Sequence, residues 1–294
     1  MYISTEINSF QKYGDNRAVL KLLKEAGFTA YDFSMFYGSN AETEILNHDD
    51  YLERAKAFRA FADELGLPCN QAHAPFPSAT SDEYPRFGMT TEEYNRFAYE
   101  KITRAIEVAG VLGANCIVVH PWNYYTPEEN AELYRSFETT ARKAGVKIAV
   151  ENMWNWDKGA PTASAAACSH PTDFQAHLEL LPKDLYIACV DVGHAEMAGL
   201  DTDAATMLET LGERVQALHI HDNDCVHDDH KLPYTMKINF AKIIDSLKKI
   251  GYQGDVTLEA DSYIKSFPLE LYPQGAKFMA ATAEYIRKKL EKNS

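Results

Sequence analysis

The feature that most constrains this chain is a regular alternation of short β-rich runs with longer amphipathic segments. Strands are expected at 2–6, 29–34, 69–73, 116–120, 147–151, 186–191, 215–221 and 255–259. Helices are expected at 16–26, 49–66, 91–112, 127–144, 171–180, 203–211, 239–250 and 269–291. Because each of the eight strands is followed by a helix, the pattern predicts an α/β fold, a single (β/α)8 TIM barrel over residues 1–294. A doubly wound open sheet is the rival fold, but no GxGxxG follows the first strand.

The ends of the predicted helices carry residues that start and stop helices. Thr90 or Thr91 is suited to cap the helix at 91–112, and Thr126 with Pro127 behind it is suited to begin the next one. Glycine often ends a helix because it adopts the left-handed conformation readily. Glycines follow several of the predicted helices, at Gly27, Gly66, Gly113, Gly145 and Gly251.

The composition is that of a globular protein with an acidic surface. The chain is 46% hydrophobic and 24% charged, with a formal net charge of −14. This charge repels a phosphate backbone and no cluster of Lys and Arg offsets it, so no nucleic-acid partner is expected. The sequence shows no signal peptide and no run of about 18 apolar residues, so no membrane partner is expected. The five cysteines are dispersed without CxxC spacing, which favours reduced thiols and a cytoplasmic location.

Ionisable side chains stand at the ends of six consecutive predicted strands. Buried parallel strands are normally almost wholly apolar, and one histidine at a strand end is more often an ordinary buried residue than a ligand. Six together indicate a site, because the C-terminal strand ends of a barrel converge on one mouth, where active sites lie. The residues are His73, His120, Glu151, Asp191, His219 or His221, and Glu259.

These residue types form a mixed set of oxygen and nitrogen ligands. Such a set suits Mn²⁺, Zn²⁺, Mg²⁺ or Co²⁺ and argues against a thiolate-rich zinc site. No GxSxG elbow is present. No glycine-rich phosphate loop is present either, and the loop after the eighth strand lacks the glycines of a phosphate cup, so a phosphorylated substrate is not supported. Trp122, Trp154 and Trp156 follow the fourth and fifth strands. Their aromatic faces are suited to stacking on a sugar ring or, alternatively, to capping the barrel as ordinary hydrophobic packing.

Short motifs in a specific order carry a resemblance over essentially the whole chain. They are HAPF at 73–76, HP at 120–121, VEN at 150–152, DVGH at 191–194, GERVQALHIHD at 212–222 and LEA at 258–260. The chain resembles the xylose-isomerase-like barrels, a family that includes sugar isomerases, ketose 3-epimerases and class II apurinic endonucleases. The resemblance implies a metal-dependent isomerase or epimerase of a sugar or sugar derivative that works through an enediolate.

The resemblance also implies the roles of individual residues. One divalent ion would be held by Glu151, Asp191, His219 and Glu259. The expected ion is Mn²⁺ or Zn²⁺, with Mg²⁺ or Co²⁺ as alternatives. Glu151 and Glu259 would also serve as the catalytic acid–base pair. The small-molecule carbohydrate would be bound by His73, His120, Trp122, Trp154, His194, His221 and His230. A homo-oligomer is compatible with the sequence.

The histidine-rich stretch after the seventh strand leaves one ligand ambiguous. His219 and His221 have the same strand parity, so periodicity does not choose between them. The resemblance favours His219, with Asp222 supporting it from behind. We expect His227 to be solvated and His230 to fold back toward the site.

Two departures and one rival qualify the resemblance. Cys225 stands where ketose 3-epimerases have Arg, and Asp157 where they have Glu, which puts free-ketose 3-epimerisation in doubt. The alternative function is that of a zinc-dependent phosphodiesterase like the endonucleases. Asp228 and His230 form a DxH pattern that resembles one in that branch of the family. The acidic charge and the absence of basic DNA-reading loops argue against that rival.

Overall fold

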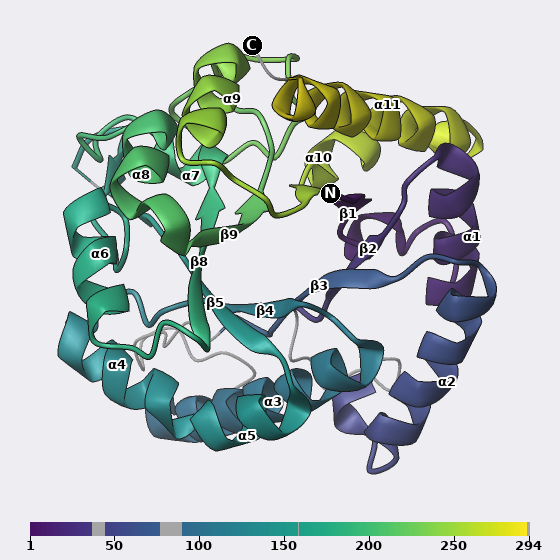
Figure 1. Ribbon diagram of the computed structural model, residues 1–294, viewed down its shortest axis with the longest axis horizontal. Helices are drawn as coiled ribbons and strands as arrows, with labels where there is room; N and C mark the ends of the chain where they lie inside the picture. Colours follow the sequence, from purple (N-terminus) through teal and green to yellow (C-terminus); the bar gives the residue numbers. More distant parts are fainter. Residues whose placement is uncertain (37–44, 77–89, 158, 293–294) are drawn as a thin grey trace.

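The computed structural model describes residues 1–36, 45–76, 90–157 and 159–292 of the chain. Parallel strands form a ring in the centre of the molecule, and helices surround it (Figure 1). The ring strands are β1 Ile3–Thr5, β2 Tyr31–Ser34, β3 Cys69–His73, β4 Cys116–Val119, β5 Lys147–Glu151, β8 Tyr186–Asp191, β9 Val215–His219 and β10 Val256–Leu258.

Two parallel sheets and two isolated bridges close the ring. Six strands pair in the order β2-β3-β4-β5-β8-β9, and β1 pairs with β10. The bridge between Glu6 and Asp32 joins β1 to β2, and the bridge between Ile220 and Leu258 joins β9 to β10. The predicted barrel is therefore confirmed, and closure leaves no exposed edge among these strands.

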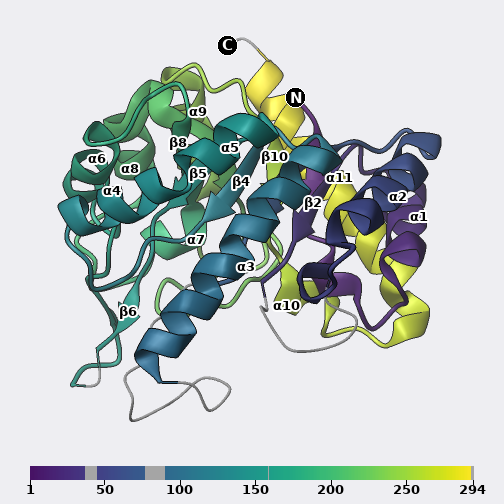
Figure 2. The same ribbon diagram turned by 90° about the horizontal axis from the view of Figure 1, so that it is seen from below.

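The helices of the barrel lie outside the strands and follow them in order (Figures 1 and 2). The expected helix at 127–144 is two helices, because the chain turns at Phe137, and short helices follow several strands. The α-helices are α1 Asn16–Ala26, α2 Tyr51–Glu64, α3 Thr91–Leu112, α4 Pro127–Ser136, α5 Glu138–Ala144, α6 Pro171–Glu179, α7 Val192–Ala195, α8 Ala204–Leu211, α9 Phe240–Lys249, α10 Asp261–Ile264 and α11 Tyr272–Glu291. The 3-10 helices are η1 Asn8–Phe10, η2 Ile45–Asn47, η4 Gly212–Arg214 and η5 Leu269–Leu271. None of the helices in the described ranges combines the length and apolar composition that a membrane span requires.

The expected helix caps are confirmed. The Thr90 hydroxyl accepts a hydrogen bond from the backbone N–H of Glu93 at 3.3 Å, and the Glu93 carboxylate accepts one from the Thr90 backbone at 2.9 Å. Thr126 and Glu129 form the same capping box at the start of α4. Each box satisfies backbone donors that a helix start otherwise leaves free.

Strand alternation divides the core into an outer and an inner part. Ile117 and Val119 point outward into the large core between strands and helices. Cys116 and Val118, between and beside them, point inward into a small apolar cluster of inner-facing strand residues. Successive side chains on a strand face opposite ways, so His120 continues the inward-facing series.

A short hairpin extends the chain after β5. Strands β6 (Asn155–Trp156) and β7 (Ala163–Ser164) pair antiparallel in the segment between β5 and α6. Figure 2 shows β6 projecting on the side of the barrel where α10 follows the end of β10. The hairpin therefore belongs to the mouth side of the barrel.

Candidate active site

Four ionisable side chains meet at the C-terminal end of the barrel interior. Glu151, Asp191, His219 and Glu259 each offer one ligand atom, and these atoms lie within 4.8 Å of one another. The Nδ1 atom of His219 is 2.8 Å from Glu151 Oε1 and 3.2 Å from Glu259 Oε2. The strand pattern explains the meeting, because Glu151, Asp191 and His219 stand two positions beyond the inward-facing Ala149, Cys189 and Ala217.

These four residues fit a divalent cation. All are buried, and three buried carboxylates around one imidazole carry a negative charge that an ion would neutralise. Asp191 Oδ2 has no hydrogen-bond partner in the described part of the chain. Oxygen donors with one nitrogen donor suit Mn²⁺, Zn²⁺, Mg²⁺ or Co²⁺.

Asn152, which follows Glu151 in the VEN motif, fastens this group to the next strand. Its side-chain amide donates to the Asp191 carbonyl at 2.9 Å, and its carbonyl oxygen accepts the Asp191 backbone N–H at 2.8 Å. A side chain that bonds both backbone groups of Asp191 holds the ends of β5 and β8 in one register. Asn152 therefore positions two members of the candidate site.

Two further histidines lie on the other side of Glu151. The Nε2 atoms of His120 and His73 are 2.9 Å and 3.5 Å from Glu151 Oε2. His73 donates its Nδ1–H to the Ala74 carbonyl at 2.7 Å, which leaves its Nε2 as an acceptor or ligand atom. Burial lowers the pKa of His120 to about 4 against the opposing effect of Glu151, so this ring is neutral at pH 7.

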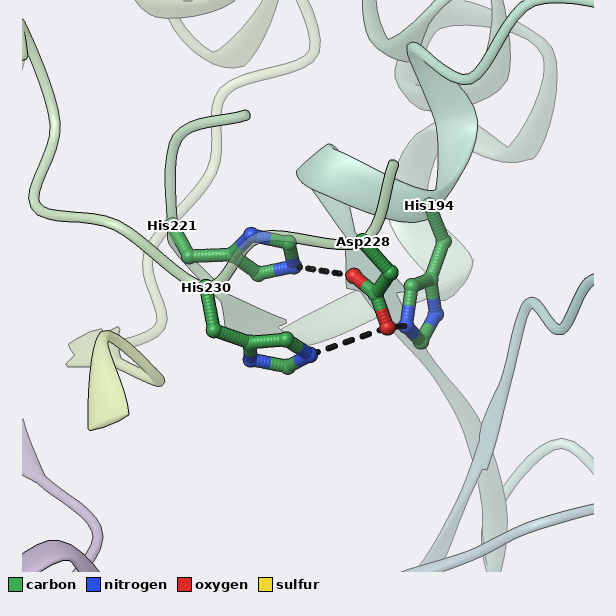
Figure 3. A group of neighbouring side chains, drawn as sticks. All are labelled: His194, His221, Asp228 and His230. Atoms are coloured by element: carbon green, nitrogen blue, oxygen red, sulfur yellow. Dashed lines mark hydrogen bonds and ion pairs between the residues drawn. The ribbon is translucent and has the colours of Figure 1, made fainter. Parts of the chain in front are cut away.

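A second group of possible ligands adjoins the first. Figure 3 shows the rings of His194, His221 and His230 around the carboxylate of Asp228. Asp228 Oδ2 lies 3.0 Å from His230 Nε2 and 3.4 Å from His194 Nε2, and Oδ1 lies 3.5 Å from His221 Nε2. One ligand atom from each of the four residues lies within 4.8 Å of the others.

Backbone carbonyls orient two rings of this second group. His194 donates its Nδ1–H to the Asn152 carbonyl at 2.9 Å, and His230 donates its own to the Glu259 carbonyl at 2.8 Å. Both rings therefore turn Nε2 toward Asp228. Burial disfavours charge on these imidazoles, but nearby carboxylates outweigh it and raise the pKa of each well above its ordinary value. The group can hold protons or a cation at the same nitrogen atoms.

His219 and His221 serve different groups. His221 is fully buried, stacks on His230 with ring centroids 4.0 Å apart, and has Nε2 3.0 Å from Asp191 Oδ1. Its other ring nitrogen, Nδ1, has no hydrogen-bond partner in the described residues. The geometry brings His219 to the four-residue group and places His221 between Asp191 and the second group.

A cavity of about 270 Å³ opens onto both groups. It brings together four of the seven residues expected to bind substrate: His120, Trp154, His194 and His230. His73 and His221 lie behind its wall, and Trp122 is packed in the hydrophobic core. The full lining is Phe76, His120, Pro121, Asn123, Glu151, Met153, Trp154, His194, Asp228, His230 and Glu259.

The structure corrects one expected contact and adds residues. Asp222 does not support His219, because its carboxylate accepts the backbone N–H groups of Asn223, Met236 and Ile238 and so shapes the following loop. Asp228 lines the cavity. In the sequence, its DxH pattern had pointed only to the alternative phosphodiesterase function. Phe76 ends the HAPF motif but had no predicted role, and Asn123 and Met153 carry no signal in the sequence, because apolar and amide residues in loops have no distinctive pattern.

Comparisons with known proteins assign the family. A sequence profile described as xylose isomerase-like TIM barrel matches residues 20–282, so the chain belongs to that family. The uncharacterized protein MJ1311 of Methanocaldococcus jannaschii is 30% identical over 196 residues, which are 64% of this chain and 62% of that protein. The matched segment therefore spans under two thirds of that relative's length.

Solved structures agree with the fold. A D-tagatose 3-epimerase-like protein superposes with a TM-score of 0.71 and 21% identity, over 99% of this chain and 100% of that chain. The IolI protein with a bound zinc atom superposes with a TM-score of 0.69 and 14% identity, over 99% of this chain and 98% of that chain. At these identities the likeness establishes the barrel fold.

Proposed function

We propose that this protein is a divalent-metal-dependent isomerase or epimerase of a sugar or sugar derivative. The observation that carries the proposal is the pairing of Glu151 and Glu259. These carboxylates come from β5 and from the end of β10, approach the same nitrogen of His219, and both line the cavity. Two acid–base groups that flank one substrate site can remove a proton from a carbon and return it.

The two glutamates stand in different electrostatic environments. Burial raises the pKa of Glu151, but His219 and His120 outweigh that effect and hold it well below the ordinary value. Burial raises the pKa of Glu259, and His219 and His230 only partly oppose it. A pair whose pKa values are pushed apart is suited to one base and one acid.

The metal site would supply the electrophile of the reaction. Glu151, Asp191, His219 and Glu259 would hold the ion, which when bound polarises a carbonyl and its neighbouring hydroxyl. One glutamate would take the proton next to the carbonyl, giving an enediolate, and the other would return it. His194 and His230, which line the cavity, would bind substrate hydroxyls.

The cavity supports an uncharged sugar as substrate. Trp154 lines it, and an indole face is suited to the apolar face of a sugar ring. Among the described lining residues there is no lysine or arginine to bind a phosphate. The structural similarity to a D-tagatose 3-epimerase-like protein and to the IolI protein with a bound zinc atom agrees with this substrate class and with a metal.

The test is proton exchange at carbon, measured on a panel of free ketoses and keto-glycosides in D₂O with added Mn²⁺ or Zn²⁺. We expect deuterium to enter next to the carbonyl and an epimer or isomer to form. Glu151→Gln and Glu259→Gln should each lower turnover by at least about 10²-fold, because each removes one proton-transfer group. Full turnover by both variants would show the proposed chemistry to be wrong.

A second function is favoured by the surplus of ligand groups. Besides the four-residue group, His73, Glu151 and His219 form a further set, and the Asp228 group forms another. Several adjacent cations suit phosphodiester cleavage. About three zinc ions per chain, with nicking of a duplex that contains an abasic site, would favour that reaction. One ion per chain without nicking would exclude it.

A further inference from the structure

We propose that Asp32 is a positioning residue for His219, holding the imidazole so that its Nδ1 faces the metal. This assignment rests on the metal site of the proposed function. It adds a residue outside the four ligands and outside the cavity lining. Asp32 lies in β2, on the far side of His219 from Glu151 and Glu259, and it takes the place that the sequence had suggested for Asp222.

The contacts place a fixed carboxylate behind the ring. Asp32 Oδ2 lies 3.9 Å from His219 Nε2, which is an ion-pair distance, longer than a direct hydrogen bond. Gln71 donates from its side-chain amide to the same Oδ2 at 2.9 Å and stands beside Asp32 in the register of β2 and β3. Asp32 is only 1% exposed, so bulk water does not screen this contact.

His219 is oriented differently from the other site histidines. Three of those rings donate Nδ1–H to a backbone carbonyl and present Nε2 to the site; they are His73, His194 and His230. His219 presents Nδ1 to Glu151 and Glu259 instead, so its Nε2 faces a different group. The acidic residue at that nitrogen is Asp32, and the His73 ring, stacked 5.5 Å away at 15°, limits rotation of the imidazole.

Asp32 is poorly supported as a purely structural residue. Its Oδ1 atom has no hydrogen-bond partner in the described part of the chain, and a buried carboxylate with few partners lowers stability. Glu6, the bridge partner of Asp32 on β1, likewise has one oxygen, Oε1, without a partner in the described residues, but its Oε2 serves the local backbone. Its carboxylate accepts the Ser9 backbone N–H at 2.8 Å and the Ser34 hydroxyl at 3.3 Å, and so organises the local backbone.

The physical effect of such a carboxylate is known in outline. A carboxylate behind a ligating imidazole fixes the tautomer and increases the basicity of the nitrogen that binds the metal. Loss of such a partner lowers metal affinity by about 10–100-fold. We therefore expect Asp32→Asn to keep the shape of the residue and to weaken the binding of Mn²⁺, Zn²⁺ and Co²⁺ by that factor.

The experiment measures metal affinity without turnover. The full chain is stripped of metal, and the affinities of wild type, Asp32→Asn, Asp32→Glu and Glu6→Gln for Zn²⁺ and Co²⁺ are measured by chelator competition. Co²⁺ absorption reports the coordination, and the melting temperature of the metal-free protein reports the fold. Glu6→Gln is the matched control, because it also removes one buried carboxylate from the barrel.

The expected result is specific to Asp32. Asp32→Asn should bind more weakly by about 10–100-fold and change the Co²⁺ spectrum, while its metal-free melting temperature stays at or above that of wild type. Asp32→Glu should recover part of the affinity, and Glu6→Gln should bind within about threefold of wild type.

Two outcomes would overturn the assignment: wild-type affinity in Asp32→Asn, or an equal loss in Glu6→Gln. A failed sugar assay with intact metal binding would overturn the proposed reaction and not the role of Asp32.

Discussion

Three imidazoles in the cavity region are oriented by the group that their Nδ1 atom contacts. His73, His194 and His230 use backbone carbonyls, which neither titrate nor move independently of the barrel. The Nδ1 atom of His221 has no hydrogen-bond partner in the described residues, and this ring is held by the carboxylates at its Nε2 and by close packing. Its ring lies against the backbone of Gly193, where a Cβ atom would stand 2.0 Å from Cε1.

Gly193→Ala is therefore expected to be destabilising. The added methyl group cannot fit beside a fully buried ring, so either His221 or the start of α7 must move. Overpacking of this kind costs about 1–3 kcal/mol in the free energy of unfolding, measurable by urea denaturation. Gly159→Ala is the control, because Gly159 is exposed and its nearest contact is the flexible Asp157 side chain. Equal stability of the two variants would show that the ring adapts.

At the scale of elements, the loops that follow the strands contribute residues to the cavity wall, whereas the helices pack around the outside of the barrel. The segment after β5 contributes Met153 and Trp154 to the wall and then forms the β6–β7 hairpin. Trp156 in that hairpin is 42% exposed and stacks on His227, 5.7 Å away. As expected, His227 is largely solvent-exposed.

Trp154 and Trp156 provide a matched pair for testing the sugar-binding role. Trp154→Ala should raise the KM for the sugar by about 5–10-fold, because it removes an aromatic face worth about 1 kcal/mol or slightly more. Trp156→Ala should leave KM within about twofold of wild type, since this residue does not line the cavity. Steady-state kinetics on the substrate found in the exchange assay gives both values. An unchanged KM in Trp154→Ala would remove Trp154 from substrate binding.

Helix α4 allows a test of the capping box. The Thr126 hydroxyl accepts the Glu129 backbone N–H at 3.3 Å, and the Glu129 carboxylate accepts the Thr126 backbone N–H at 2.8 Å. Thr126→Ala should lower the free energy of unfolding by about 0.5–2 kcal/mol, and Thr126→Ser should restore most of it. Urea denaturation provides the measurement. A Ser variant as unstable as Ala would point to the methyl group rather than the hydroxyl.

Over the whole molecule, the balance of buried acids and histidines links metal binding to pH. Burial opposes protonation of His194, His219 and His230, but the neighbouring carboxylates outweigh it, and the pKa of each lies well above 6.5. For a base with a raised pKa in the fold, the stabilisation is complete below the unfolded pKa and is lost as pH rises through the folded pKa. The metal-free protein should therefore lose stability as pH rises above about 6.5.

Metal binding should respond in the opposite direction. A metal binds unprotonated nitrogen, so each proton that it displaces makes affinity rise about tenfold per pH unit below the folded pKa. The melting temperature with Zn²⁺ or Mn²⁺, compared with that of the metal-free protein from pH 6 to pH 8.5, gives the test. The difference should grow with pH. A constant difference over this range would mean that these imidazoles do not exchange protons for metal.

Interactions between residues close together in the sequence determine much of this protein's structure. Strand–helix alternation indicated the barrel, and the cap residues Thr90 and Thr126 start helices as expected. The sequence also shows Glu151 and His219 at the ends of predicted strands, a position that depends only on neighbouring residues. These features were predictable since each is encoded within a few consecutive positions.

Tertiary structure alone decided which of these residues meet. His219 and His221 both point into the barrel. They join different groups because the strands opposite them place different side chains at the two levels along the barrel axis. Asp32 lies behind His219 although the two are far apart in sequence, whereas Asp222, three residues from His219, turns to its own loop. Contacts across a barrel depend on the stagger and closure of its strands, which are properties of the whole ring.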